Sequence, residues 1–299
     1  MSAAKILDLS NLTEYVEQKS DELLTSAILG AKTLDVIDVM LNVKYTAPLN
    51  YLDSTVVLAD ASTCGWDPQG EDEFTQRTIE VFPVKVNKEW CARDMRKYWM
   101  NYQLLIDANR ETLPFEEKIV AENIKAINIE LEKEIWTNDA SALFPGFLYV
   151  LEDEGANTID VSTASDGVDA AYGEITDAMY AHDDVTMFMD PTLYRTFIKE
   201  ANAVCCANRD MLDAASDYIT FPGDSRVILR PTAGLAGTSK IVVTWATNLV
   251  FGTDVEGSEN DYKVWYDDKD EMTCFKVLFN AGVQVKFPDQ AAIITVDDR

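Results

Sequence analysis

One histidine, His182, is present in the sequence, so a serine or cysteine nucleophile that needs a histidine base would have to use it. It lies in the polar stretch Ala181-His182-Asp183-Asp184, between an expected helix and an expected strand. That position favours a solvated turn over a catalytic base. A zinc site is also disfavoured, because zinc prefers clusters of histidine and cysteine.

Carboxylates are the other abundant chemical groups. Asp183, Asp184 and Asp190 could bind a hard cation, although their spacing is not that of an EF-hand. The stretch Asp267-Asp268-Lys269-Asp270 indicates an acidic turn with at most weak, unspecific cation binding. A carboxylate-dependent hydrolase such as a glycosidase needs only two such groups. With 52 aspartates and glutamates, pairs are too common to discriminate for or against it.

The remaining reactive residues form no known motif. The cysteines are odd in number and include no CxxC pair, so we expect free reduced thiols at Cys64, Cys91, Cys205, Cys206 and Cys274. The phosphate-binding patterns GxxxxGK(S/T) and GxGxxG are absent. The scattered tryptophans are expected to anchor a core or an interface. We therefore expect a structural role, with no enzymatic activity, cofactor or metal.

Composition and charge narrow the class of protein. Hydrophobic residues make up 47% of 299 residues, enough for a sizeable core in one large or two smaller domains. Lys and Arg number 25 against 52 acidic residues, which gives a net charge of −27. A direct DNA reader is not expected, because DNA affinity depends on Lys and Arg at phosphates. Neither a signal-peptide core nor an apolar run of about 20 residues occurs, so we expect a soluble protein made in a cytosol.

Two amphipathic helices are expected in the first half of the chain. Apolar residues at helical spacing predict one over 12–29, with Gly30 as its C-terminal cap. A longer helix is expected over 113–137, with Pro114 near its start. Its apolar stripe recurs every three or four residues, and glutamates including Glu132 decorate the other faces. The stripe consists of Val120, Ile124, Ile127, Leu131 and Ile135.

The clearest pattern is a long strand near the end of the chain. Apolar residues occupy every second position from Phe275 to Phe287, with Leu278 as the one exception on the polar face. This is the period of a strand with one buried face. About 13 residues would span roughly 40 Å, more than twice the usual strand length. Such a strand must run the length of the molecule or join two domains.

A projecting arm is expected over 54–86. Residues 54–59 and 78–86 are candidate strands, and the connector 64–73 is acidic and rich in turn residues. The connector is longer than most hairpin loops, and its polar tip cannot pack a core of its own. An ordinary surface loop is the alternative. The preceding segment, 36–52, is expected to be extended and broken by Pro48 and Asn50.

Shorter elements are expected between 140 and 250, where Gly, Ala, Asp and Ser become more frequent. The expected elements are a helix within 172–181, a strand over 185–189, a helix that begins at Asp190-Pro191-Thr192, and strands over 226–230 and 240–245. A last short strand is expected over 291–296. This mixture predicts the α+β fold class.

The order of these parts resembles the major capsid proteins of tailed bacteriophages, which have the Hong Kong 97 fold. That family has an N-terminal arm, an extended two-stranded loop, a long spine helix, an axial domain and long strands that return to a peripheral domain. Stretches 135–148, 187–194, 248–254 and 279–292 are each similar to the family segment at the corresponding place. In the first of them, the resemblance implies a strand that begins at Gly146.

The resemblance implies five parts. These are an N-terminal arm over 1–53, the extended loop over 54–86, a peripheral domain with the spine helix over 87–138, an axial domain over 139–254, and C-terminal strands over 255–299 that return to the peripheral domain. It also implies a subunit that assembles in the host cytoplasm into the hexamers and pentamers of an icosahedral virion. The shell would enclose double-stranded DNA without sequence-specific binding.

The tip of the extended loop is implied to contact neighbouring copies. Its residues are Trp66, Asp67, Pro68, Gln69, Gly70, Glu71, Asp72 and Glu73. Some family members cross-link through a loop lysine, but no lysine lies between Lys44 and Lys85 here. Noncovalent contacts are therefore expected. Further partners implied by the family are portal, scaffolding and decoration proteins, and no membrane.

Three other interpretations remain open from the sequence. An encapsulin has the same fold and packages an enzyme, and its gene neighbours would distinguish it from a phage protein. A carboxylate-dependent hydrolase would require a cleft with shifted carboxylate pKa values. An acidic cell-surface or tail protein is the third, and the lack of a signal peptide counts against export.

Overall fold

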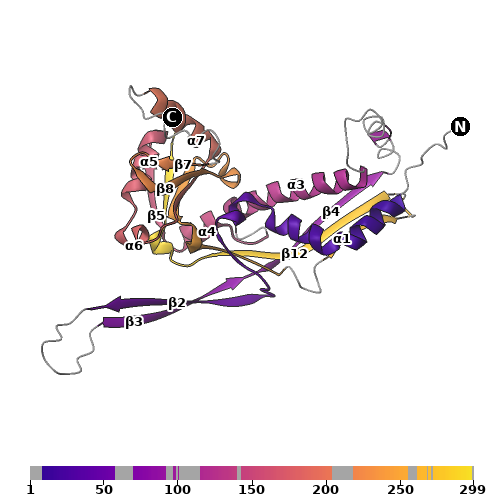
Figure 1. Cartoon of the computed structure of the whole chain (residues 1–299), viewed down its shortest axis with the longest axis horizontal. Helices are drawn as coiled ribbons and strands as arrows, with labels where there is room; N and C mark the ends of the chain where they lie inside the picture. Colours follow the sequence, from indigo (N-terminus) through magenta and orange to yellow (C-terminus); the bar gives the residue numbers. More distant parts are fainter. Residues whose placement is uncertain are drawn as a thin grey trace.

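The computed structural model describes residues 9–57, 70–91, 97–98, 100, 115–139, 143–203, 218–254, 261–267, 269–270 and 272–297. These residues form two mixed sheets, helices packed on them and a separate two-stranded ribbon. The molecule is elongated, with one sheet at each end of the body and the ribbon projecting away from it (Figure 1). The fold class is α+β, as expected.

The strand β12 (Met272–Val285) organises the first sheet. On one edge it pairs with β10 (Leu249–Asp254) and β11 (Asp261–Asp267), and on the other with β4 (Phe82–Cys91). The short β1 (Asp38–Met40) pairs with β10. Side-chain burial alternates along β12 from Thr273 to Ala281, and Leu278 lies on the more exposed face. The expected long strand is confirmed.

Two helices cover the buried face of this sheet. They are α1 (Leu9–Leu29) and α3 (Phe115–Thr137), which contact each other and close one hydrophobic core with Phe275, Val277 and Phe279. Both expected helices are confirmed, and the α3 stripe faces the core as predicted. Glu132 departs from the expectation, because its side chain is buried rather than on a solvated face.

The second sheet has the strand order β5-β13-β9-β6-β8-β7. Its strands are β5 (Asn157–Val161), β6 (Val185–Met189), β7 (Ile219–Phe221), β8 (Asp224–Pro231), β9 (Lys240–Trp245) and β13 (Ala292–Val296). Around it lie α4 (Phe147–Asp153), α5 (Ala164–Gly173), α6 (Asp177–Tyr180) and α7 (Pro191–Ala203). Strands β6 and β9 have the predicted bounds, and α7 begins where Asp190-Pro191-Thr192 predicted a helix.

Two local expectations for this region are wrong. The strand expected from Gly146 is the helix α4, because Phe147, Leu148 and Leu151 are buried at helical spacing. The single helix expected within 172–181 is two helices. The helix α5 ends at Gly173, and Thr176 starts α6 by accepting a hydrogen bond from the Met179 amide at 3.2 Å.

The end of the chain also differs from the expectation. Strands β11 and β12 do lie in the first sheet, but β13 lies in the second, between β5 and β9. Ile293 and Ile294 point to opposite faces and are both fully buried, which suits a central strand. Conversely, β10 belongs to the first sheet although it falls inside the segment 139–254.

The ribbon consists of β2 (Thr46–Val56) and β3 (Gly70–Glu80), paired in register from Thr46–Glu80 to Val56–Gly70. Within the described chain these two strands form a sheet of their own. The expected strands 54–59 and 78–86 are therefore misplaced, because the ribbon begins earlier and Val81 separates β3 from β4. Pro48 and Asn50 lie inside β2 instead of breaking it, since a two-stranded ribbon has outer edges that need no amide donor.

Candidate assembly surfaces

The ribbon leaves the body where it crosses the first sheet, on the face opposite α1 and α3. Gly252 and Gly282 are register partners in β10 and β12 at this crossing. A Cβ on Gly282 would collide with the backbone carbonyl of Glu80, and a Cβ on Gly252 would lie 2.8 Å from Cδ1 of Ile79. The glycines therefore allow the backbone of the ribbon base to approach the sheet closely.

A small hydrophobic cluster packs between the base of the ribbon and the first sheet at this crossing. It consists of Val43, Leu49, Ile79, Val81 and Val250. Backbone hydrogen bonds join Val81 to Tyr45 at 2.9 Å and Val43 to Thr253 at 3.1 Å. The base is thus packed as a minor core, separate from the cores of the two sheets.

Arg77 links the ribbon to the first sheet and to the helix α4. Its Nη1 donates to the carbonyl of Val285, the last residue of β12, at 2.7 Å. Its Nη2 lies 2.7 Å from a carboxylate oxygen of Glu154, which caps the C-terminus of α4. The two side chains are 23% and 25% exposed, so this pair is better shielded from water than a surface pair.

The partner strand β2 contacts the body through Tyr51. Its ring packs against Phe287 with centroids 5.1 Å apart, and the Lys286 ammonium lies 6.0 Å from the ring centroid. Lys286 also pairs with Asp38 at 2.8 Å. Burial raises the pKa of the Tyr51 hydroxyl to about 12, an effect that nearby Arg77 opposes and Asp38 reinforces.

The predicted tip residues fall into two groups. Trp66, Asp67, Pro68 and Gln69 lie outside the described residues. Gly70, Glu71, Asp72 and Glu73 were expected in a turn, but their backbone continues β3 and pairs with residues 53–56 of β2. In sequence, the segment 53–73 carries acidic residues and no Lys or Arg. Its acids are Asp53, Asp60, Asp67, Glu71, Asp72 and Glu73.

Beyond the crossing, the same face of the first sheet carries a group of basic residues. Register places Lys276 of β12 beside Lys263 of β11, and Lys85 of β4 beside Leu278. Lys85 and Lys263 are exposed, and Trp265 is 42% exposed. We call this surface the outer face. It consists of Lys85, Asn87, Glu89, Asp261, Lys263, Trp265, Asp267, Cys274, Lys276 and Leu278, so by register its three lysines lie among three acidic residues.

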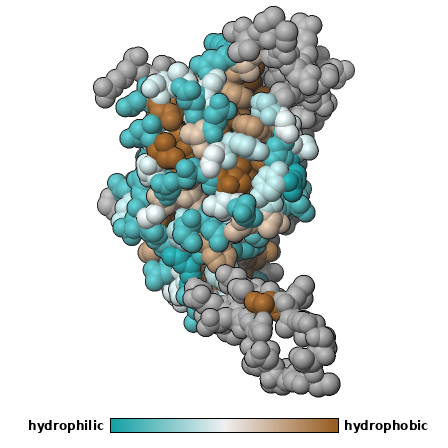
Figure 2. Space-filling model, turned by 90° about the vertical axis from the view of Figure 1, so that its left-hand side faces the viewer, coloured by the Kyte–Doolittle hydropathy of each residue, from teal (hydrophilic) through white to brown (hydrophobic). Residues whose placement is uncertain are grey.

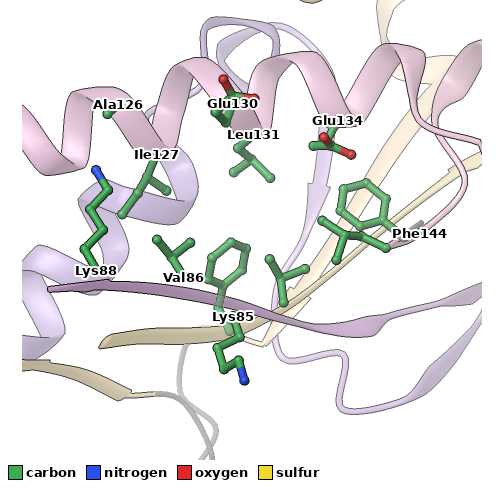
Figure 3. A pocket seen from close by; sticks show the side chains of 12 residues that line it. Lys85, Val86, Lys88, Ala126, Ile127, Glu130, Leu131, Glu134 and Phe144 are labelled. Atoms are coloured by element: carbon green, nitrogen blue, oxygen red, sulfur yellow. The ribbon is translucent and has the colours of Figure 1, made fainter. Parts of the chain in front are cut away.

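A groove runs along the opposite side of the sheet, between α3 and β4 (Figure 3). Its volume is about 210 Å³, which is below the ~300–1,000 Å³ of most ligand pockets. Ile127, Leu131 and Phe144 line its apolar interior, while Lys85 points away from it (Figure 3). Burial is the main cause that raises the pKa of Glu134, which lies at its rim.

A buried carboxylate joins α3 to the turn after α1. Glu132 is 4% exposed and accepts hydrogen bonds from both the amide and the hydroxyl of Thr33, the former at 3.0 Å. The Trp136 indole in turn donates to the Thr33 hydroxyl at 2.9 Å. Burial raises the pKa of Glu132 despite these hydrogen bonds. Sequence reasoning missed this network because its partners are 99 residues apart.

The residues considered for catalysis have structural partners. The exposed His182 ring stacks on Trp245 at 4.3 Å. Asp190 accepts hydrogen bonds from the amides of Thr192, Gly237 and Ser239 at 2.7, 2.8 and 3.1 Å. Asp184 accepts two from Thr247.

The acidic turn and the two described cysteines form no candidate catalytic or metal site. Asp267 accepts a hydrogen bond from the Lys269 amide at 2.9 Å. Cys91 and Cys274 are free thiols, and the other three cysteines lie outside the described residues. Among the residues that the structure describes, no group of three His, Cys, Asp or Glu side chains could hold a metal ion. None of the described helices is long and apolar enough to cross a membrane.

Sequence comparisons identify no relative. No protein-family model matches the chain, and no curated protein sequence matches it. The relationship is visible only in three dimensions, because solved structures with a similar fold are 15% identical or less in the three cases below.

Three solved structures match over nearly the whole chain. A chain of the procapsid of satellite phage P4, determined with its size determination protein, is 10% identical with a TM-score of 0.64, covering 98% of this chain and 99% of that one. A chain of Mycobacterium phage Bobi is 15% identical with a TM-score of 0.55, covering 99% and 100%. A chain of a virus-like particle from Pyrococcus furiosus is 12% identical with a TM-score of 0.56, covering 94% and 99%. The chain therefore has the Hong Kong 97-type capsid fold.

Proposed function

We propose that this chain is the major capsid protein of a tailed bacteriophage, which assembles through hexamers and pentamers into an icosahedral head around double-stranded DNA. The observation that carries the proposal is the coverage of 98% and 99% against the P4 procapsid chain. Both sheets, the helices and the ribbon are thus matched together, rather than one widespread domain. The protein would assemble in the host cytoplasm and remain in the virion.

The ribbon supports assembly on physical grounds. Eleven-residue strands project about 35 Å at the usual rise per residue. A two-stranded ribbon is only marginally stable by itself in water. In Figure 1 the ribbon runs below the end of the body that carries the second sheet and reaches beyond it, and in the described chain its two strands pair only with each other. A second copy of the chain supplies a surface for its far end in a shell.

The outer face is the surface that we propose for the neighbour's ribbon. Segment 53–73 has acidic residues and no base, and Lys85, Lys263 and Lys276 lie together on the outer face. The three lysines can pair with acidic residues of the ribbon, whereas the segment 53–73 of a second ribbon offers no cation, so this encounter is favoured over ribbon–ribbon contact. Trp66 and its neighbours up to Glu73 would then make the assembly contacts, with partly exposed Trp265 and Leu278 as apolar partners. With no loop lysine, these contacts are noncovalent.

The two sheets suggest separate roles in the shell. The first sheet with α3 corresponds to a peripheral domain and the second to an axial domain, whose copies would meet at the symmetry axes. The end of the molecule that carries the second sheet has hydrophobic groups separated by hydrophilic ones, without one continuous apolar patch (Figure 2). Many modest contacts between preformed subunits fit such a surface.

The net charge of −27 bears on what the shell contains. So acidic a chain would enclose DNA without binding its sequence, because phosphate contacts depend on Lys and Arg. Portal, scaffolding and decoration proteins are the further partners that this function requires or commonly uses. A second candidate function is an encapsulin-like compartment, which holds a protein cargo. It stays in consideration because one of the matching structures is a virus-like particle and not a phage capsid.

Deletion of residues 60–74 tests the role of the ribbon. The shortened chain is expected to fold, with an unchanged circular-dichroism spectrum and thermal transition, and to form no normal shells in electron micrographs. The matched control replaces the same residues with a Gly/Ser linker of equal length. Normal shells from the deletion variant would contradict the proposal.

A further inference from the structure

Arg77 is the only Lys or Arg between Lys44 and Lys85. It lies on β3, three residues before the ribbon ends at Glu80. If the charged residues of the projecting ribbon only keep it hydrated, they give no reason for a single basic residue among acidic ones. Its side chain is turned toward the body instead, where it is 23% exposed.

The two ends of its guanidinium group reach two different parts of the molecule. One end donates to the Val285 carbonyl at the end of β12, and the other pairs with Glu154 at the C-terminus of α4, each at 2.7 Å. A planar guanidinium holds two partners in a fixed relative direction, which a single ammonium does not. The contact therefore constrains how the ribbon can rotate.

The glycine crossing supplies the second fixed point. The backbone at Glu80 rests against Gly282, so the ribbon is held at the crossing and again at Arg77. Two points along β3 define a direction, to which the Tyr51–Phe287 contact adds a point on β2, whereas the crossing alone would act as a pivot. A small rotation at this base moves the far end of an ~35 Å ribbon by a much larger distance.

We propose that Arg77 is a positioning residue that fixes the direction in which the ribbon leaves the body. In a shell, that direction sets the angle at which neighbouring copies meet. The second statement rests on the proposed capsid function, whereas the first is a property of the single chain.

Arg77→Met tests the single-chain statement by removing both contacts at similar side-chain length. Hydrogen exchange followed by mass spectrometry is expected to accelerate about tenfold at residues 46–50 and 76–80 and to stay unchanged in β6 and β9. Lys199→Met is the matched control, since it also removes one cation, from the exposed side of α7, and is expected to leave exchange at the ribbon base unchanged. Unchanged exchange in Arg77→Met would overturn the proposal.

A charge exchange separates positioning from simple structural support. Arg77→Glu is expected to accelerate exchange at the base, and the double variant Arg77→Glu/Glu154→Arg to restore part of the protection by reforming the ion pair. Failure of the double variant to recover any protection counts against the pair. If Arg77→Met has lost its thermal transition, Glu154→Gln, which leaves the Val285 contact in place, provides the test with a smaller expected acceleration.

Particle shape tests the second statement separately. In electron micrographs, Arg77→Met is expected to broaden the diameter distribution of shells, whereas Lys199→Met keeps it narrow. A narrow, unchanged distribution would overturn the link between ribbon direction and shell geometry. If the unaltered chain forms no shells, the capsid function fails, and the exchange result still decides whether Arg77 positions the ribbon.

Discussion

Gly252 of β10 lies directly opposite Gly282 of β12, and the base of the ribbon crosses the sheet over this pair. A side chain at either position would enter space that Glu80 or Ile79 occupies. The pair explains how a β-ribbon can cross a continuous sheet at backbone distance. It also makes the ribbon direction sensitive to single methyl groups.

Gly282→Ala is expected to destabilise the fold by about 1–3 kcal/mol, because the new Cβ meets backbone that cannot move without shifting the ribbon. Thermal or urea unfolding measures the change. Gly173→Ala is the control, since an added Cβ there meets no atom within 4 Å. Equal stability of the two variants would show that the crossing tolerates a wider spacing.

Glu132→Gln is expected to change the pH dependence of stability. Burial raises the pKa of Glu132 above its ordinary value of 4.5, so the folded state holds this proton more tightly than the unfolded state. Its contribution is complete below pH 4.5 and is lost as pH rises through the raised pKa. The glutamine variant should therefore gain stability relative to the unaltered chain as pH rises. Urea unfolding from pH 4 to 8 measures this difference, and a difference independent of pH would contradict the assignment.

Thr33→Val is expected to cost about 1–3 kcal/mol, because it leaves the Glu132 carboxylate and the Trp136 indole without their shared hydroxyl. Urea unfolding again provides the measurement. Thr196→Val is the control, since its hydroxyl bonds only to a carbonyl one turn earlier on exposed α7. If Thr33→Val lowered the free energy of unfolding no more than Thr196→Val, the buried network would contribute little to stability.

Lys263→Glu combined with Lys276→Glu is expected to leave the chain folded and abolish shells, because the outer face would then repel an acidic ribbon. Size-exclusion chromatography and electron microscopy measure assembly. Lys199→Glu, on exposed α7, is the control for charge reversal alone. Normal assembly of the double variant would exclude the outer face as the ribbon's docking surface.

Elements with one buried face were predictable from the sequence. The alternation along β12 and the stripe along α3 appear because each residue's burial repeats with the period of its element. The ribbon bounds were not predictable in this way. The side chains from Thr46 to Tyr51 do alternate between exposed and more buried, but the run is short and Pro48 imitates a break in it.

Features that depend on partners distant in the chain could not be predicted from the sequence. Which sheet receives β13 depends on the packing of β5 and β9, and Glu132 is buried only because Thr33 reaches it. Arg77 left a usable signal, since it is the only base in a long acidic stretch. Gly252 and Gly282 left none, because nothing in the sequence aligns them across two strands. The tip contacts of Trp66 to Glu73 remain a prediction.

The central claim is that this chain builds a closed shell through its ribbon and two sheets. The most direct measurement is the size of the expressed, unaltered chain by size-exclusion chromatography with light scattering, followed by electron microscopy of the leading fraction. The account predicts capsomers or closed shells of megadalton mass. A monodisperse 33.4 kDa monomer at every concentration and salt condition would contradict it.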